Sequence, residues 1–209
     1  MILLKFRPGF ASYLDELAEF GTRLFEGRIV PISRSAGSLT YPANFTLIGS
    51  MNPCPCGSHG DPEKECSCSP TMVTRYQKRI SGPLMDRIDI HVQVPRVAFE
   101  KLSDDRAGEP STIVRERVEE ARSVQRERFT GTKLQTNTDI GPGEIQEYCP
   151  VDATGRGLLK AAMSQLHLSP RAYHRILKLA RTIADLAGAA QIESPHLAEA
   201  IQYRPRSQV

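Results

Sequence analysis

The stretch FTLIGSMNPCPCGSHGDPEKECSCSPTMVTRYQKRISGPLMDRIDIHVQV, residues 45–94, decides how the first half of the chain folds. Its apolar start, Phe45–Gly49, predicts a core strand, and the polar Asn52 comes shortly after the end of that strand. Four cysteines and a short basic helix follow, and the apolar alternation from Ile88 to Val94 predicts a second strand. The stretch therefore predicts an α/β unit in which a cysteine-rich loop connects a strand to a helix.

The cysteines are the most specific pattern in the chain. Cys54-x-Cys56 and Cys66-x-Cys68 form two pairs with nine residues between them. Four soft thiolates at this spacing converge on one Zn²⁺ in tetrahedral geometry, and a site whose four positions are all taken is structural rather than catalytic. The alternatives are free thiols in a loop or a redox pair. An odd total of five cysteines, with four crowded together, fits reduced thiols better than a disulfide framework.

Composition sets the class of protein. With 209 residues, of which 40% are hydrophobic, the chain can bury one good core or two small ones. The net charge of +3 is ordinary, so any surface for nucleic acid has to be a local one. No apolar run approaches the roughly 20 residues that a membrane span needs. We therefore expect a soluble cytoplasmic protein with no membrane partner.

Two adjacent carboxylates near the N-terminus are candidates for metal chemistry. Asp15 and Glu16 follow a short apolar run that Pro8 and Gly9 interrupt. Adjacent carboxylates after a strand can hold a hydrated Mg²⁺ and polarise an attacking water. The alternative is that they begin an exposed amphipathic helix whose apolar residues face inward.

Residues 27–42 have the pattern of a β-hairpin. Two strand-like runs flank Ser35-Ala36-Gly37, in which the glycine can take the positive φ that a tight turn needs. Arg34 then lies near the tip of the hairpin. There its guanidinium either contacts phosphates or is simply solvated.

Asn52 and Arg87 are each open to two interpretations. The amide of Asn52 can orient a water against a terminal phosphate, or it can begin an Asx turn before the cysteine loop. The guanidinium of Arg87 can reach the γ-phosphate held by a neighbouring subunit, or it can pair with Asp86 or Asp89. Spacing alone favours the structural interpretation for both residues.

The second half of the chain has a helical pattern. After a linker at residues 98–110, the predicted buried stripe of the first helix is Val114, Val118, Ala121, Val124 and Phe129. Further helices are expected near residues 143–148, 153–166, 169–186 and 194–203. Ser-Pro pairs predict helix starts at Ser69, Ser169 and Ser194, while Gly82-Pro83 and Gly188 predict helix ends. Residues 111–209 therefore predict an all-helical bundle.

The helix at residues 169–186 has two predicted faces. Its buried stripe is Ala172, Ile176, Leu179, Ala180, Ile183 and either Leu186 or Ala187. Basic residues occupy another face, beginning with Arg171 in the first turn. Arg171 can lean onto a nucleotide phosphate, although a basic helical face is more often solvated.

The 209 residues contain no phosphate-binding loop. The pattern Gly-x-x-x-x-Gly-Lys-Ser/Thr does not occur, since no glycine is followed by lysine. The nest of backbone N–H groups and the lysine that cradle a triphosphate are therefore not encoded here. We expect the chain by itself neither to bind ATP tightly nor to hydrolyse it.

Several stretches together carry a resemblance to a known family. They are FTLIGSMNPCPCG at 45–57, CSCSP at 66–70, RYQKRISGPLMDRIDIHVQVPRV at 75–97 and LSPRAYHRILKLARTIADLAG at 168–188. In these stretches the chain resembles the C-terminal part of the bacterial magnesium-chelatase-like AAA+ proteins of the ComM/YifB family. The resemblance extends over residues 27–95 and 111–204. It implies a chain that begins before or within the Walker B segment and lacks the N-terminal protease-like domain of the family.

The resemblance gives each candidate residue a role. Asp15 and Glu16 would be the Walker B pair, Asn52 sensor 1, Arg87 an arginine finger acting in trans, and Arg171 the sensor 2 arginine. The hairpin with Arg34 would project toward the pore of a hexameric ring. Residues 1–97 would form a partial AAA+ nucleotide-binding subdomain with the zinc-type cysteine loop, and residues 111–209 an all-α lid. ATP and Mg²⁺ would act in the complete family protein only.

Three functions are compatible with the sequence. The first, implied by the resemblance, is a fragment of an ATP-dependent, helicase-like motor for DNA branch migration in natural transformation. The second is a zinc-stapled module that binds DNA or partner subunits without hydrolysing nucleotide, with salt-sensitive DNA binding by Arg34, Arg75, Lys78 and Arg79. The third is a magnesium-chelatase subunit. An incomplete sheet with an open edge also predicts self-association or marginal stability of the first half.

Overall fold

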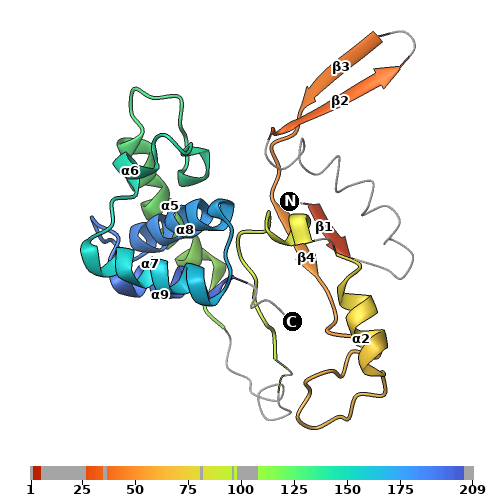
Figure 1. Cartoon of the computed structure of the whole chain (residues 1–209). Coiled ribbons are helices and arrows are strands. Elements are labelled where there is room, and N and C mark those ends of the chain that lie inside the picture. Colours follow the sequence, from red (N-terminus) through yellow and green to blue (C-terminus); the bar gives the residue numbers. More distant parts are fainter. Residues whose placement is uncertain are drawn as a thin grey trace. The chain divides into compact units, whose positions relative to one another are not determined.

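The computed structural model describes residues 2–5, 27–34, 37–80, 82–95, 97 and 108–204 (Figure 1). Its contacts divide the chain into two compact units, one extending to Ile88 and the other beginning at Asp89. The first unit combines strands with short helices, and the second is helical. The mixed α/β class predicted from the sequence is therefore confirmed, and the boundary between the units lies before residue 97.

A parallel pair of strands lies in the first unit. Strand β1, Ile2–Lys5, pairs with strand β4, Leu47–Ser50, with Ile2 opposite Leu47. The strand predicted at 45–49 is thus confirmed with a small shift of its ends. Ile48 is 45% exposed, so β4 is not the buried core strand that its apolar sequence predicts. Among the described residues β1 is its one partner strand.

The predicted hairpin is confirmed as an antiparallel pair (Figure 1). Strand β2 is Ile29–Arg34 and strand β3 is Gly37–Pro42. Gly37 has φ +137°, which meets the expectation of a glycine with positive φ at the turn. Val30 lies opposite Tyr41 and Ile32 opposite Leu39, so these four side chains share one face of the hairpin.

Two short helices follow the cysteine loop. Helix α2, Pro70–Gln77, begins as predicted, because the Oγ of Ser69 accepts a hydrogen bond from the backbone N–H of Met72 at 3.3 Å. The prediction that Gly82-Pro83 ends this helix was wrong. Instead α2 ends at Gln77, and Gly82 begins the four-residue helix α3, Gly82–Met85. A proline in the first turn of a helix loses no hydrogen bond, which is why this pair can start one.

The predicted second strand over Ile88–Val94 was also wrong. None of these residues belongs to a strand. The backbone N–H of His91 donates to the carbonyl oxygen of Tyr203 at 2.9 Å, and the Asp89 carboxylate forms an ion pair with Arg175. This segment is therefore held by the helical unit instead of by a neighbouring strand.

The second unit is built from helices near the predicted places, with the short helix η1 added in a stretch where no helix was predicted. Their bounds are α5 Ser111–Arg128, η1 Asn137–Asp139, α6 Ile145–Tyr148, α7 Ala153–Gln165, α8 Pro170–Leu186 and α9 Ser194–Gln202. A single apolar core lies between them, and its most buried large side chains are Ile140, Leu159, Ile176, Leu177 and Leu197. Gly155 allows α7 to approach α9 closely, since a Cβ there would lie 2.7 Å from the Leu197 Cδ1 atom.

The helix ends follow their capping residues, with one exception. Ser169 caps α8 by accepting from the N–H of Ala172 at 3.2 Å, and Gly188 ends it with φ +67°. At α9 the predicted cap Ser194 is already the first helical residue. The N-cap is Glu193, whose backbone N–H donates to the Nδ1 of His196 at 3.0 Å.

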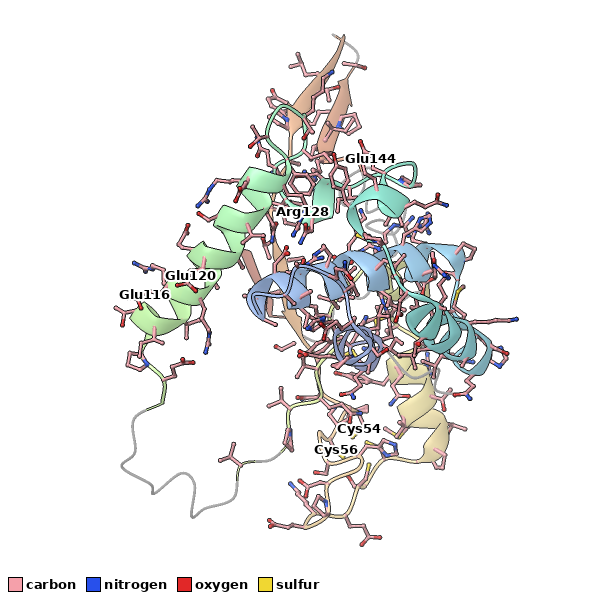
Figure 2. The ribbon with its side chains drawn as sticks, turned by 90° about the vertical axis from the view of Figure 1, so that its left-hand side faces the viewer. Cys54, Cys56, Glu116, Glu120, Arg128 and Glu144 are labelled. Atoms are coloured by element: carbon pink, nitrogen blue, oxygen red, sulfur yellow. The ribbon has the colours of Figure 1, made fainter. Side chains whose placement is uncertain are left out.

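The buried stripe predicted for α5 was partly wrong. Ala121 and Phe129 are buried, but Val114, Val118 and Val124 are between 37% and 42% exposed. All of residues 111–120 are exposed, so the helical core covers only the second half of α5. Figure 2 shows the two halves, with Glu116 and Glu120 on the exposed half and Arg128 at the end of the helix.

The buried stripe predicted for α8 is mostly confirmed. Ala172, Ile176 and Ala180 are buried, and Leu179 and Ile183 pack against the core while partly exposed. Leu186, in contrast, is 47% exposed, because the helix ends there. No helix in the described part of the chain is long and apolar enough to cross a membrane.

Candidate functional site

The four predicted cysteines come together in the first unit. The Sγ atoms of Cys54 and Cys56 are 3.3 Å apart, and the Sγ of Cys66 lies 3.7 Å and 3.6 Å from them. All four ligand atoms, with Cys68, lie within 4.8 Å of one another. A tetrahedral zinc ion with Zn–S bonds of about 2.3 Å places its sulfurs about 3.8 Å apart. The cluster therefore fits one such ion, and its four thiols fill the coordination sphere.

The loop around the cluster is shaped by local turns. The N–H of Gly57 donates to the carbonyl oxygen of Cys54 at 3.1 Å, and Gly57 has φ +83°, a conformation that favours glycine. Between the two pairs, the Oδ1 of Asp61 accepts from the N–H groups of Glu63 and Lys64. These turns reverse the chain so that the second pair of cysteines returns to the first. Figure 2 shows Cys54 and Cys56 on this loop.

The electrostatics of the cluster favour a bound cation. A backbone N–H from Ser58 and a hydrogen bond from Cys54 lower the pKa of Cys56 to about 5. The pKa of Cys66 is raised to about 12. The backbone N–H of Cys68 lowers this pKa, but desolvation, the hydrogen bonds to Cys56 and Cys54 and the charge of Cys54 together raise it by more. One thiolate thus makes its neighbours harder to ionise. A divalent metal ion is what allows all four sulfurs to be thiolates together.

Asn52 lies next to this loop, two residues after the end of β4. It is exposed, and a Cβ built on Gly57 would lie 3.8 Å from its Nδ2 atom. The amide therefore rests beside the turn that carries the first cysteine pair. Ligands of α/β sheets bind beyond the carboxyl ends of parallel strands, which is where Asn52 is placed. Its role as a nucleotide sensor stays a prediction.

The other predicted site residues are placed separately. Arg87 is half-buried two residues after the end of α3, Arg171 is exposed in the first turn of α8, and Arg34 is the last residue of β2. Asp15 and Glu16 lie outside the described residues. Asp89, one of the two suggested partners of Arg87, forms its ion pair with Arg175. Of the predicted residues that the structure describes, it is the four cysteines that are brought together.

Sequence reasoning missed a buried ionic cluster in the helical unit. The carboxylate of Asp185 has no exposed surface and accepts from Arg128 at 2.8 and 2.5 Å, from Asn137 at 2.8 Å and from Arg181 at 3.1 Å. Arg181 also donates to the carbonyl oxygens of Ala189 and Ala190 beyond the end of α8. The hydrogen bond to Asp185 raises the pKa of Arg128, whereas desolvation lowers the pKa of Arg181.

The ionic cluster is structural. Buried charges persist when they are paired and hydrogen-bonded, as all of these are. The one sequence signal is the spacing of Arg181 and Asp185, which places opposite charges one turn apart on an otherwise apolar helix face. Arg128 and Asn137 join through tertiary contacts, with no local signal.

Comparisons with known proteins identify the family. A family model described as "Magnesium chelatase, subunit ChlI" matches residues 10–102, and one described as "Magnesium chelatase, subunit ChlI C-terminal" matches residues 108–204. The class is thus that of the magnesium-chelatase-type proteins. Within it, the chain belongs to the magnesium-chelatase-like family that includes ComM and YifB.

The curated relatives are longer than this chain. The chain is 40% identical over 202 residues to the competence protein ComM of Haemophilus influenzae. It is 38% identical over 200 residues to YifB of Salmonella typhimurium and 36% identical over 200 residues to YifB of Escherichia coli. Each match covers 92% of the chain but only 38% of the relative. The chain therefore spans about two fifths of the length of these relatives.

Proposed function

We propose that this chain acts as the C-terminal part of an ATP-dependent AAA+ motor that remodels DNA, in the manner implied by its similarity to ComM. The observation that carries the proposal is the position of Asn52. It is an exposed amide just beyond the carboxyl end of a strand that pairs in parallel with β1. That edge is where an α/β sheet presents polar groups to a ligand. The family membership of the chain supports the same reading.

Each residue has a proposed task in ATP hydrolysis. Asp15 would hold the hydrated Mg²⁺, Glu16 would polarise the attacking water, and Asn52 would orient that water. Arg87 would act on the nucleotide of the neighbouring subunit in a ring, where its guanidinium offsets the charge that develops on the phosphoryl oxygens. Arg171 would contact the nucleotide from the helical unit of its own subunit.

The decisive experiment measures ATP turnover by an extended chain that carries a phosphate-binding loop ahead of these residues, and compares the unaltered chain with its Arg87→Ala variant. Arg87→Ala is expected to lower turnover by about 10³-fold, the effect typical of a lost arginine finger. Mixing Arg87→Ala subunits with Asn52→Ala subunits tests the trans arrangement. Mixed rings should recover activity, because an intact Asn52 site then meets an intact Arg87. Undiminished turnover in Arg87→Ala, or no recovery on mixing, contradicts the proposed role.

A second candidate function is a metal-stapled module that binds DNA or a partner subunit without hydrolysing nucleotide. The observation that favours it is the complete cysteine cluster in a chain whose 209 residues encode no phosphate-binding loop. Isothermal calorimetry with ATP and Mg²⁺ separates the two functions for this chain. Tight uptake of ATP by the 209 residues excludes the module. Absence of uptake by the extended chain excludes the motor.

A further inference from the structure

Arg75 in the last turn of α2, together with Lys78 and Arg79 just beyond its end at Gln77, forms a small cluster of cations, here called the cationic face of α2. The side chains of Arg75, Lys78 and Arg79 are exposed. They line one surface hollow together with Pro70, the first residue of α2, and the hydroxyl-bearing Thr71 and Thr74. Residues 70–80 contain three basic residues and no acidic one. Within the described part of the chain, none of the three cations is paired with a carboxylate.

Two exposed arginines of α5, in contrast, are paired with carboxylates. On α5, Arg117 pairs with Glu109 at 3.0 Å and Arg126 pairs with Glu119 at 3.6 Å. The chain as a whole has a net charge of +3, which is the charge of the eleven residues 70–80 alone. The cationic face of α2 is therefore a local concentration of positive charge on a nearly balanced protein, and an anion is the ligand that such a face attracts.

The cysteine loop holds this face in position. Helix α2 begins at Pro70, two residues after Cys68. Near its other end, the Nε2 of Gln77 donates to the carbonyl oxygen of Pro53 at 3.1 Å. Val73, on the opposite side of the helix, is buried. Both ends of α2 are thus fastened to the loop that carries the metal ligands, so a bound ion would fix the direction in which the cations point.

We propose that the Arg75, Lys78 and Arg79 face of α2 binds the phosphodiester backbone of nucleic acid, and that a metal ion in the cysteine cluster keeps it in its binding orientation. Arginine and lysine side chains are the usual partners of phosphate oxygens. The chain has no tryptophan and only 6% aromatic residues, which gives little surface for stacking bases. Contact with the backbone alone predicts binding that does not depend on base sequence.

This inference deepens the proposed function and rests on DNA being its substrate, but it does not involve ATP. Of the DNA contacts expected from the sequence, it keeps those near α2 and drops Arg34 of the hairpin. The hairpin strands have one charged residue, Arg34, and exposed apolar side chains at Ile32, Leu39 and Tyr41. That face is poorly suited to a polyanion.

The test is fluorescence anisotropy with the zinc-loaded full chain and a labelled single-stranded DNA oligonucleotide of mixed sequence, titrated at several salt concentrations. Three phosphate contacts predict a slope of log K against log salt of about −2 for single-stranded DNA. Arg75→Gln/Arg79→Gln should weaken binding about tenfold at low salt and reduce the slope by about 1.4. Arg117→Gln/Arg126→Gln, which removes the same charge from α5, should leave both quantities unchanged.

Four further results decide the proposal. Equal loss in the two double variants would show an effect of net charge alone and overturns it, as does absence of binding by the unaltered chain at low salt. The proposal is also overturned if polyglutamate displaces the labelled oligonucleotide as effectively as RNA or duplex DNA does, since the face would then accept any polyanion. Chelation of zinc should lower the affinity of the unaltered chain to that of the α2 variant, and unchanged affinity overturns the role of the metal. ATP turnover, measured separately, leaves these outcomes unaffected.

Discussion

The two units of the molecule are stabilised by different interactions. The helical unit has one apolar core and, beside it in the chain's own helices, a buried aspartate that is fully paired. In the first unit, the buried residues among those described are few, namely Cys54, Ser58, Val73 and Leu84. Much of the apolar surface of β4 and of the hairpin stays exposed. The helical unit is thus ordered by its own side chains, whereas the described part of the first unit buries little besides its cysteine cluster, which could hold a metal ion. We expect such an ion to order the first unit.

The largest expected effect is on zinc affinity. It should differ between Cys54, a cysteine of the cluster, and Cys149, the buried cysteine of the helical unit. Cys54→Ser should lower zinc affinity by about 100-fold or more, because one of four thiolate ligands is lost. Cys149→Ser should leave zinc affinity unchanged, since this thiol lies in the other unit and burial raises its pKa to about 11. Competition titration with a chromogenic chelator measures both. Equal loss in the two variants contradicts a site confined to the first unit.

The next effect contrasts a buried and an exposed ion pair within the helical unit. Asp185→Ala leaves the buried Arg181 and the partly buried Arg128 without their carboxylate and should cost about 3–5 kcal/mol of unfolding free energy. Glu119→Ala removes only the exposed partner of Arg126 and should cost less than about 1 kcal/mol. Urea denaturation followed by circular dichroism gives the two values. Similar values for both would mean that the Asp185 cluster contributes little to this unit.

The smallest effect concerns two equivalent helix caps, one in each unit. Ser169→Ala should lower the unfolding free energy of the helical unit by about 1 kcal/mol, because the N–H of Ala172 loses its acceptor. Ser69→Ala removes the same bond from α2 and should leave the helical unit unchanged. The measurement is the main helical transition in urea for both variants. A shift caused by Ser69→Ala would show that the two units unfold together.

Features with a local chemical cause were predicted well from the sequence. The two cysteine pairs predict their own convergence, because nothing but a short loop separates them. The starts of α2 and α8 follow from a serine that accepts a backbone N–H and a proline that needs no donor. The hairpin follows from two strand-like runs around Gly37. In each case the residues that decide the structure are neighbours in the chain.

Features that depend on distant partners were not predictable in this way. The alternation from Ile88 to Val94 is typical of a strand, yet the segment bonds to Tyr203 at the far end of the chain. Val118 has the same helical spacing as Ala121, but the core ends between them. Asp185 gives no sign in the sequence that Arg128 will reach it. A pattern in the sequence shows which side of an element is apolar, and the tertiary fold decides how much of that side is covered.

The most direct test of the account is hydrogen–deuterium exchange of the full chain with and without zinc. Zinc should strongly slow exchange in residues 45–80, where the cysteine loop and α2 lie, and leave exchange in residues 111–204 unchanged. Equal exchange in residues 45–80 with and without the metal would contradict the claim that an ion orders the first unit.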